Sequence, residues 1–168
     1  MKDEAKGQLA KILGDYDAKL AEIARVDAES RAAHAAFPDR FAVLARETIR
    51  PALEEIAVML NAHGHEASVR EQEESSTAGG GVKSAAIFLR VVPKPFAGGR
   101  DDGNPVAIEV VFSANRSARK VAVSSSNTMI NHGGAVGKRG EYDIDALAAD
   151  AVTAHVTTSL SEAFGAKR

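Results

Sequence analysis

The chain has 168 residues, of which 45% are hydrophobic and 26% charged, and its formal net charge is −2. This balance is typical of a folded globular protein and argues against a wholly disordered chain or a strongly cationic coat protein. The absence of cysteine excludes disulfides, thiolate metal sites and cysteine nucleophiles. No apolar run is long enough for a membrane span, and the charged N-terminus lacks the apolar region of a secretory signal. We therefore expect a cytoplasmic protein without membrane contact.

The first 36 residues are predicted to form a separate helix. Large apolar residues recur there with the alternating spacing of a coiled-coil seam, at Leu9, Leu13, Tyr16, Leu20 and Ile23. Such a seam can pack on the rest of its own chain or pair with another chain, and we expect it to form an oligomer interface. The helix is expected to fade through the alanine-rich residues 28–36.

A second helix is predicted over residues 38–63. Its apolar residues recur at helical spacing, and Gly64 follows them as a natural stop. Pro51 lies inside this helix, lacks a backbone donor and clashes with the preceding turn. We therefore expect a kink or a helix boundary near residues 47–50.

The middle of the chain is predicted to form an antiparallel sheet. Alternation of apolar and polar residues indicates strands over residues 66–73, 82–92, 106–113 and 120–124. A loop over residues 125–142 then leads to a last helix over residues 145–164, with Asp143 and Asp145 near its start. The predicted fold class is α+β in the order α-α-β-β-β-β-α, with residues 37–168 forming one domain in which a sheet of about four strands packs on helices.

The glycine-rich segment 131–140 is the strongest candidate for ligand binding. Its glycines, backbone amides and two cations suit a small anionic ligand, and the candidate residues are His132, Gly133, Gly134, Gly137, Lys138 and Arg139. The segment is not a P-loop, because His132 stands where the first glycine would be and Arg139 replaces the Ser or Thr that holds magnesium. The alternative is a solvated loop without a ligand.

Other polar residues form no recognisable catalytic or metal-binding motif. His63 and His65 flank Gly64 and could chelate a metal, yet a role at the end of the helix explains them more simply. Ser124, Ser125 and Ser126 lack the glycine elbow of a serine hydrolase and are interpreted as a polar strand end. We therefore expect no metal, no cofactor and no catalytic residue.

Three functions are compatible with these patterns. We expect a non-catalytic interaction or regulatory protein that forms homo-oligomers, with the basic β region as its partner surface. Residues 76–142 carry 9 Lys and Arg against 4 Asp and Glu, so nucleic-acid binding is an alternative, which the overall charge of −2 and the few aromatic residues disfavour. Binding of a small molecule or anion at segment 131–140, with or without catalysis, is the third.

Overall fold

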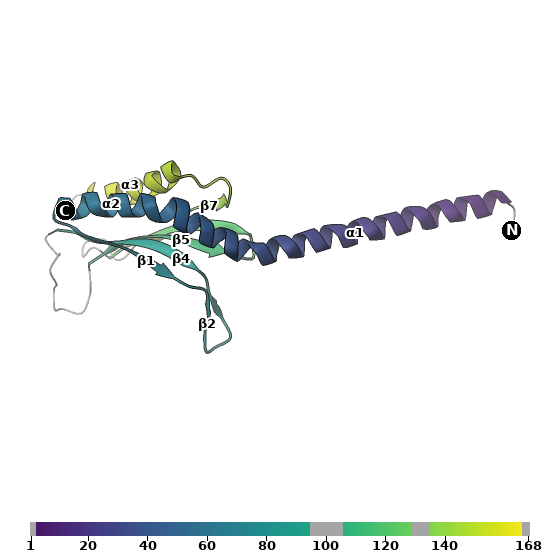
Figure 1. Ribbon diagram of the computed structural model, residues 1–168, viewed down its shortest axis with the longest axis horizontal. Coiled ribbons are helices and arrows are strands. Elements are labelled where there is room, and N and C mark those ends of the chain that lie inside the picture. Colours follow the sequence, from purple (N-terminus) through teal and green to yellow (C-terminus); the bar gives the residue numbers. More distant parts are fainter. Residues whose placement is uncertain (1–2, 95–105, 129–134, 166–168) are drawn as a thin grey trace. The chain divides into compact units, whose positions relative to one another are not determined.

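The computed structural model describes residues 3–94, 106–128 and 135–165. By their internal contacts the residues form two compact units, Met1–Ala36 and Phe37–Arg168. The first unit is helical, and the second combines helices with an antiparallel sheet, which confirms the α+β class (Figure 1). Of the candidate ligand-binding residues, His132, Gly133 and Gly134 lie outside the described residues.

The first helix, α1, runs without interruption from Asp3 to Leu44. The predictions that it fades through residues 28–36 and that a new helix begins near Pro38 are therefore wrong. Alanine has the highest helix propensity of all residues, so an alanine-rich stretch prolongs a helix instead of ending it. Pro38 is accommodated inside α1, where the neighbouring Phe37 and Phe41 are buried in the hydrophobic core of the second unit.

Pro51 marks a change of helix type. The π-helical turn η1, Ala45–Ile49, joins α1 to the α-helix α2, Arg50–Ala62, and the Arg50 N–H donates to the Ala45 carbonyl five residues back. Pro51 cannot donate to the carbonyl four residues before it, and the wider turn accommodates that loss. The predicted boundary near residues 47–50 is confirmed.

Helix α2 ends just before Gly64, as predicted from the sequence. Gly64 has a φ of +85°, its N–H donates to the Asn61 carbonyl, and the His65 N–H donates to the Leu60 carbonyl. This pair of bonds is the Schellman arrangement, which requires a left-handed residue that glycine supplies at least cost. The turn leads the chain directly into the first strand.

The sheet has five antiparallel strands in the order β1-β4-β5-β6-β7, each hydrogen-bonded to the next (Figure 1). They are β1 (Glu66–Gln72), β4 (Ala86–Val92), β5 (Ile108–Asn115), β6 (Lys120–Asn127) and β7 (Ala135–Asp143). A small separate hairpin, β2 (Ser75–Ser76) with β3 (Val82–Lys83), interrupts the chain between β1 and β4. The predicted antiparallel arrangement is confirmed, and the strand predicted over residues 82–92 is divided into β3 and β4.

Strand β7 lies where the sequence predicts a loop, so the prediction of a loop over residues 135–142 is wrong. Two glycines and two cations interrupt the apolar alternation there. In the structure this segment pairs with β6, and the register shifts between Val123 and Ser124 because β7 carries an extra residue at that point. Such a bulge changes the direction of the extra residue's side chain, which then departs from the strict alternation of the strand. The extra residue is Arg139.

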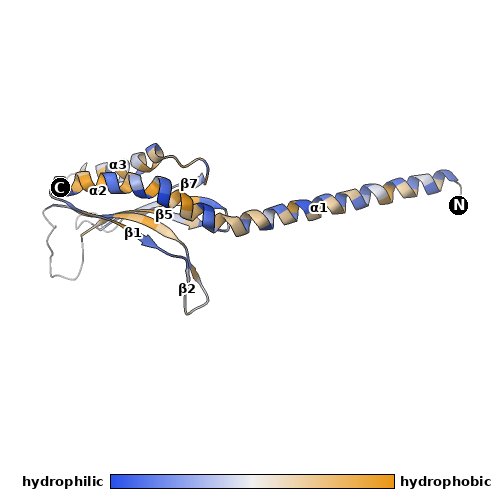
Figure 2. Ribbon diagram, viewed as in Figure 1, coloured by the Kyte–Doolittle hydropathy of each residue, from blue (hydrophilic) through white to orange (hydrophobic). Residues whose placement is uncertain are grey.

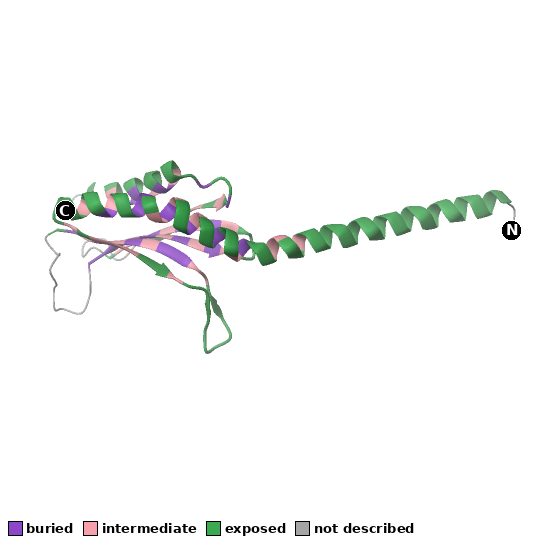
Figure 3. Ribbon diagram, in the orientation of Figure 1, coloured by how far each residue is buried: buried purple, intermediate pink, exposed green. Residues whose placement is uncertain are grey.

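The core lies between one face of the sheet and the helices α2 and α3 (Ala149–Gly165), which lie on the same side of it (Figure 1). Inward-facing residues of β4, β5 and β6 alternate with outward-facing ones, and Figure 3 shows the corresponding alternation of buried and more exposed positions. The predicted start of the last helix near Asp145 is wrong, because α3 begins at Ala149. The Ala146 N–H donates to the Asp143 carbonyl and forms a turn, and the Asp145 carboxylate pairs with Arg40 at 2.5 Å. The largest fully buried side chains are Phe112, Ile49, Leu53, Ile87, Leu89 and Ile108.

Candidate functional site

The apolar seam of α1 is exposed in the single chain. Figure 3 shows α1 as exposed over residues 3–29, and Figure 2 shows that hydrophobic and hydrophilic residues are interleaved along it. Seven large hydrophobic side chains are each 46–63% exposed, and they are Leu9, Ile12, Leu13, Tyr16, Leu20, Ile23 and Val26. We call these seven residues the α1 stripe. A contiguous exposed apolar surface of this kind is typical of an interaction site.

The α1 stripe is wider than the seam of a two-stranded coiled coil. With Leu13 and Leu20 at heptad position a, residues Leu9, Tyr16 and Ile23 fall at d. Ile12 and Val26 then fall at g, where two-stranded coiled coils usually carry charged residues. Since apolar residues at a, d and g cover about three sevenths of a helix, the pattern resembles that of a helix in a bundle.

Charged residues cover the other side of the same helix. The Arg25 guanidinium donates to Glu22, with Nε–Oε2 at 2.9 Å, and to Glu29, with Nη1–Oε1 at 2.5 Å. The bond from Arg25 holds the pKa of the Glu22 carboxyl below its ordinary value. These ion pairs lie three and four residues apart in the sequence and support the helix while remaining hydrated.

The cations of segment 131–140 do not form an anion cradle in the described residues. Gly137, Lys138 and Arg139 are in β7, so they are part of a strand and not of a loop. The Lys138 ammonium pairs with Glu141 at 3.2 Å, and hydrogen bonds from Asn115 and Lys138 lower the pKa of the Glu141 carboxyl. Gly137, Lys138 and Arg139 remain candidates, and Arg139 lines a cavity.

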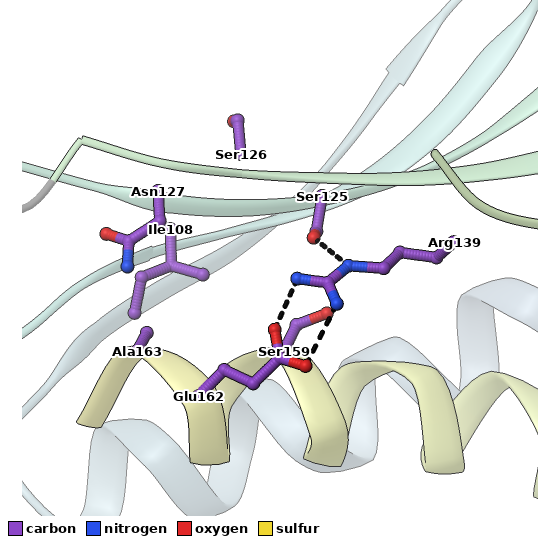
Figure 4. Close-up of a pocket in the computed structure, with 8 residues that line it drawn as sticks. All are labelled: Ile108, Ser125, Ser126, Asn127, Arg139, Ser159, Glu162 and Ala163. Atoms are coloured by element: carbon purple, nitrogen blue, oxygen red, sulfur yellow. Dashed lines mark hydrogen bonds and ion pairs between the residues drawn. The ribbon is translucent and has the colours of Figure 1, made fainter. Parts of the chain in front are cut away.

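Arg139 connects the sheet to α3 (Figure 4). Its Nε donates to the Ser125 hydroxyl at 2.7 Å, and its two terminal nitrogens donate to the two carboxylate oxygens of Glu162, with Nη1–Oε1 at 2.9 Å. This bidentate pair belongs to the stronger type of ionic hydrogen bond. The guanidinium therefore has its counterion within the fold.

Beside this pair lies a cavity of about 190 Å³ between β5, β6, β7 and α3. Figure 4 shows Arg139, Ser125 and Glu162 joined by hydrogen bonds, while Ile108 and Ala163 form an apolar part of the wall. Ser159 also lines the cavity, and its hydroxyl is buried without a hydrogen-bond partner among the described residues. Sequence reasoning missed Ser159 and Glu162, because no spacing links α3 to the distant strands β6 and β7.

A second polar contact links β7 to α3. The Tyr142 hydroxyl and the His155 Nε2 lie 2.5 Å apart, and the two rings meet edge to face. Burial lowers the pKa of His155, and the nearby Arg139 cation lowers it further. The ring is therefore held in its neutral form more strongly than an exposed histidine.

His65 has a structural role at the end of α2. Its Nδ1 accepts the Lys94 backbone N–H at 3.1 Å, and its ring stacks on Phe164 of α3 at a centroid distance of 5.1 Å. His63 caps α2 through its backbone. Among the residues that the structure describes, no group of three or more His, Asp or Glu is placed to hold a metal ion.

Most cations of the basic β region are paired with carboxylates. The pairs are Arg90 with Glu109, Arg116 with Glu74, Lys120 with Asp143, Lys138 with Glu141 and Arg139 with Glu162. Four of them join residues of the strands or their turns, and the Arg139 pair reaches a helix. Each pair neutralises charge that would otherwise attract a phosphate backbone.

No described helix combines the length and apolar character needed to cross a lipid bilayer. No family model matches the chain, and no curated protein and no solved structure matches it either. Its function therefore has to be argued from its own residues.

Proposed function

We propose that this chain is a non-catalytic, self-associating interaction protein of the cytoplasm, and that the α1 stripe is its assembly surface. The observation that carries the proposal is the exposure of seven large hydrophobic side chains at heptad spacing on one helix. Burying such a surface against a partner is favourable by about 25 cal/mol per Å² of apolar area. The cytoplasmic setting rests on the sequence composition alone.

A second copy of the same helix is the best-fitting partner. Identical stripes are complementary to one another because each offers apolar knobs at the same heptad spacing. The flanking side of α1 carries both charge signs, as with Arg25 between Glu22 and Glu29, so like helices do not repel one another strongly. Symmetric self-association is also the commonest form of assembly among soluble proteins.

The composition of the α1 stripe favours three or four helices over two. Leucine at a combined with isoleucine at d, as in Leu20 and Ile23, shifts the preference of coiled coils towards trimers and tetramers. The apolar residues at g, Ile12 and Val26, would stay half exposed in a two-stranded seam but are covered when each helix has two neighbours.

The test is the mass of the full chain in solution, measured by light scattering and sedimentation equilibrium. We expect three or four chains per particle, and a single chain for the double variant Leu13→Asp with Leu20→Asp, because unpaired charges cannot be buried in a seam. The matched control is Ala21→Asp with Ala28→Asp, which has the same spacing and charge change on exposed positions away from the stripe. The control should assemble like the parent chain, and a monomeric parent chain would refute the proposal.

A further inference from the structure

The cavity between β5, β6, β7 and α3 combines a polar rim with a deeper buried hydroxyl. The side chains of Arg139 and Glu162 are 31% and 51% exposed, so they border the opening to solvent. Ser125 and Ser159 line the same cavity and are only 5% and 4% exposed. We propose that this cavity binds a small, uncharged molecule with hydroxyl groups on adjacent carbon atoms.

The charge of the rim argues against an anion. Arg139 already has a bidentate carboxylate partner in Glu162, so the pair together carries no net charge. Adding an anion would leave one uncompensated negative charge in a partly buried place, which is costly. At Arg139 the charge balance therefore favours a neutral ligand over the anionic ligand expected from the sequence.

The rim nevertheless offers both donors and acceptors. Three of the five N–H groups of Arg139 donate to Ser125 and Glu162 within the part of the chain that the structure describes, which leaves two for a ligand. The Glu162 carboxylate can accept further bonds. Adjacent hydroxyls match this rim, because one can accept from the guanidinium while its neighbour donates to the carboxylate.

The buried hydroxyl of Ser159 gives separate evidence for a polar ligand in this cavity. Its Oγ has no hydrogen-bond partner in the described structure although the residue is buried, and an unpaired buried hydroxyl is destabilising. A ligand hydroxyl in the cavity would give it a partner. The apolar side chains of Ile108 and Ala163 suit the carbon atoms of the same ligand.

The volume limits the size of this ligand. An apolar cavity of about 150 Å³ accommodates benzene, so a cavity of about 190 Å³ holds roughly seven or eight non-hydrogen atoms. That is smaller than the usual range for drug-sized ligands, about 300–1,000 Å³. Polyols of three or four carbons meet both the size and the hydrogen-bonding requirement.

The experiment is a titration of the full chain with erythritol, a four-carbon polyol, followed by saturation-transfer NMR on the ligand. The comparison ligands are 1,4-butanediol, which has the same carbon chain without adjacent hydroxyls, and acetate, which is anionic. We expect saturable erythritol binding that is tighter than for either comparison ligand. Ser159→Ala should weaken it about three- to tenfold, as expected for one hydrogen bond. Glu162→Gln, at the exposed rim, should also weaken it.

The matched control is Ser161→Ala, an exposed serine on the same helix that does not line the cavity. It should bind erythritol like the parent chain. The proposal is overturned if erythritol shows no saturable binding, if acetate or butanediol binds at least as tightly, or if Ser159→Ala and Glu162→Gln both bind like the parent. Because the α1 stripe plays no part in this test, its outcome is independent of the assembly state.

Discussion

Leucine has opposite environments in the two compact units. Leu53 of α2 is 0% exposed and belongs to the core, whereas Leu20 of α1 is 46% exposed. Both sit in stripes of helical periodicity, so the pattern alone does not tell them apart. An amphipathic stripe therefore predicts that one face of a helix is buried, but it does not identify the surface that covers this face. The structure shows whether that surface belongs to the same chain.

The largest expected effect is the loss of a core side chain. Leu53→Ala should lower the free energy of unfolding of residues 37–165 by about 2–5 kcal/mol, because the cavity left in a packed core cannot close fully. Leu20→Ala should change the same quantity by less than about 0.5 kcal/mol, because Leu20 lies outside the hydrophobic core cluster that stabilises these residues. Amide hydrogen exchange in β5 measures both. Equal effects would show that the two stripes are not as different as their exposure indicates.

Removing residues 1–30 should separate assembly from folding. Every residue of the hydrophobic core cluster lies at or beyond Phe37, so the remaining chain keeps its core. We expect a monomer whose urea midpoint lies close to that of the parent chain. Removing residues 149–168 should instead prevent folding, because Val152 and Val156 are fully buried. A truncated chain that still assembled would place the interface outside the α1 stripe.

The sequence was sufficient for the parts of the fold governed by simple periodicity. The stripe of α2, the stop at Gly64 and the strands predicted over residues 66–73, 106–113 and 120–124 follow local rules and are present in the structure, whereas the strand predicted over residues 82–92 is divided into β3 and β4. It was insufficient for β7, since a bulged edge strand with Gly137 and Gly140 gains its pairing from β6 and not from its own propensity. The cavity could not be foreseen for a related reason: Arg139, Ser159 and Glu162 meet only after the last helix packs on the sheet.

A smaller effect is expected from pH at the contact between β7 and α3. The pKa of His155 is lowered in the folded chain by burial and then by Arg139, so the unfolded chain binds a proton at higher pH. Stability should therefore fall as the pH drops through the ordinary histidine range near 6.5, and level off below the folded pKa, with a slope under about 1.4 kcal/mol per pH unit.

His155→Gln should remove this slope, which urea unfolding at a series of pH values between 5 and 8 would reveal. Tyr142, which contacts the ring, and Arg139, whose charge acts on it, remain in the variant. His63→Gln, at the exposed end of α2, is the control and should retain the slope. If the parent chain and His155→Gln respond to pH alike, the contact does not couple folding to protonation.

The smallest expected effect is on nucleic-acid binding. Because most described cations of the β region have carboxylate partners, we expect no measurable binding to mixed-sequence DNA at physiological salt. Fluorescence anisotropy with duplex and single strands is the measurement, and the triple variant Arg116→Ala, Arg119→Ala and Lys120→Ala is the control. Micromolar binding that this variant loses would make the second unit a nucleic-acid-binding module.

The order of the strands also bears on how quickly the second unit forms. Each strand of the five-stranded sheet pairs with the strand of that sheet that comes next along the chain, and the β2–β3 hairpin lies within the interval between β1 and β4. The longest interval separates Val92, at the end of β4, from Ile108, at the start of β5. Contacts between residues close in the chain cost little loop-closure entropy, and low contact order accompanies fast folding. We expect the sheet to refold faster than a Greek-key sandwich of the same length, with the docking of α3 as the step that completes the core.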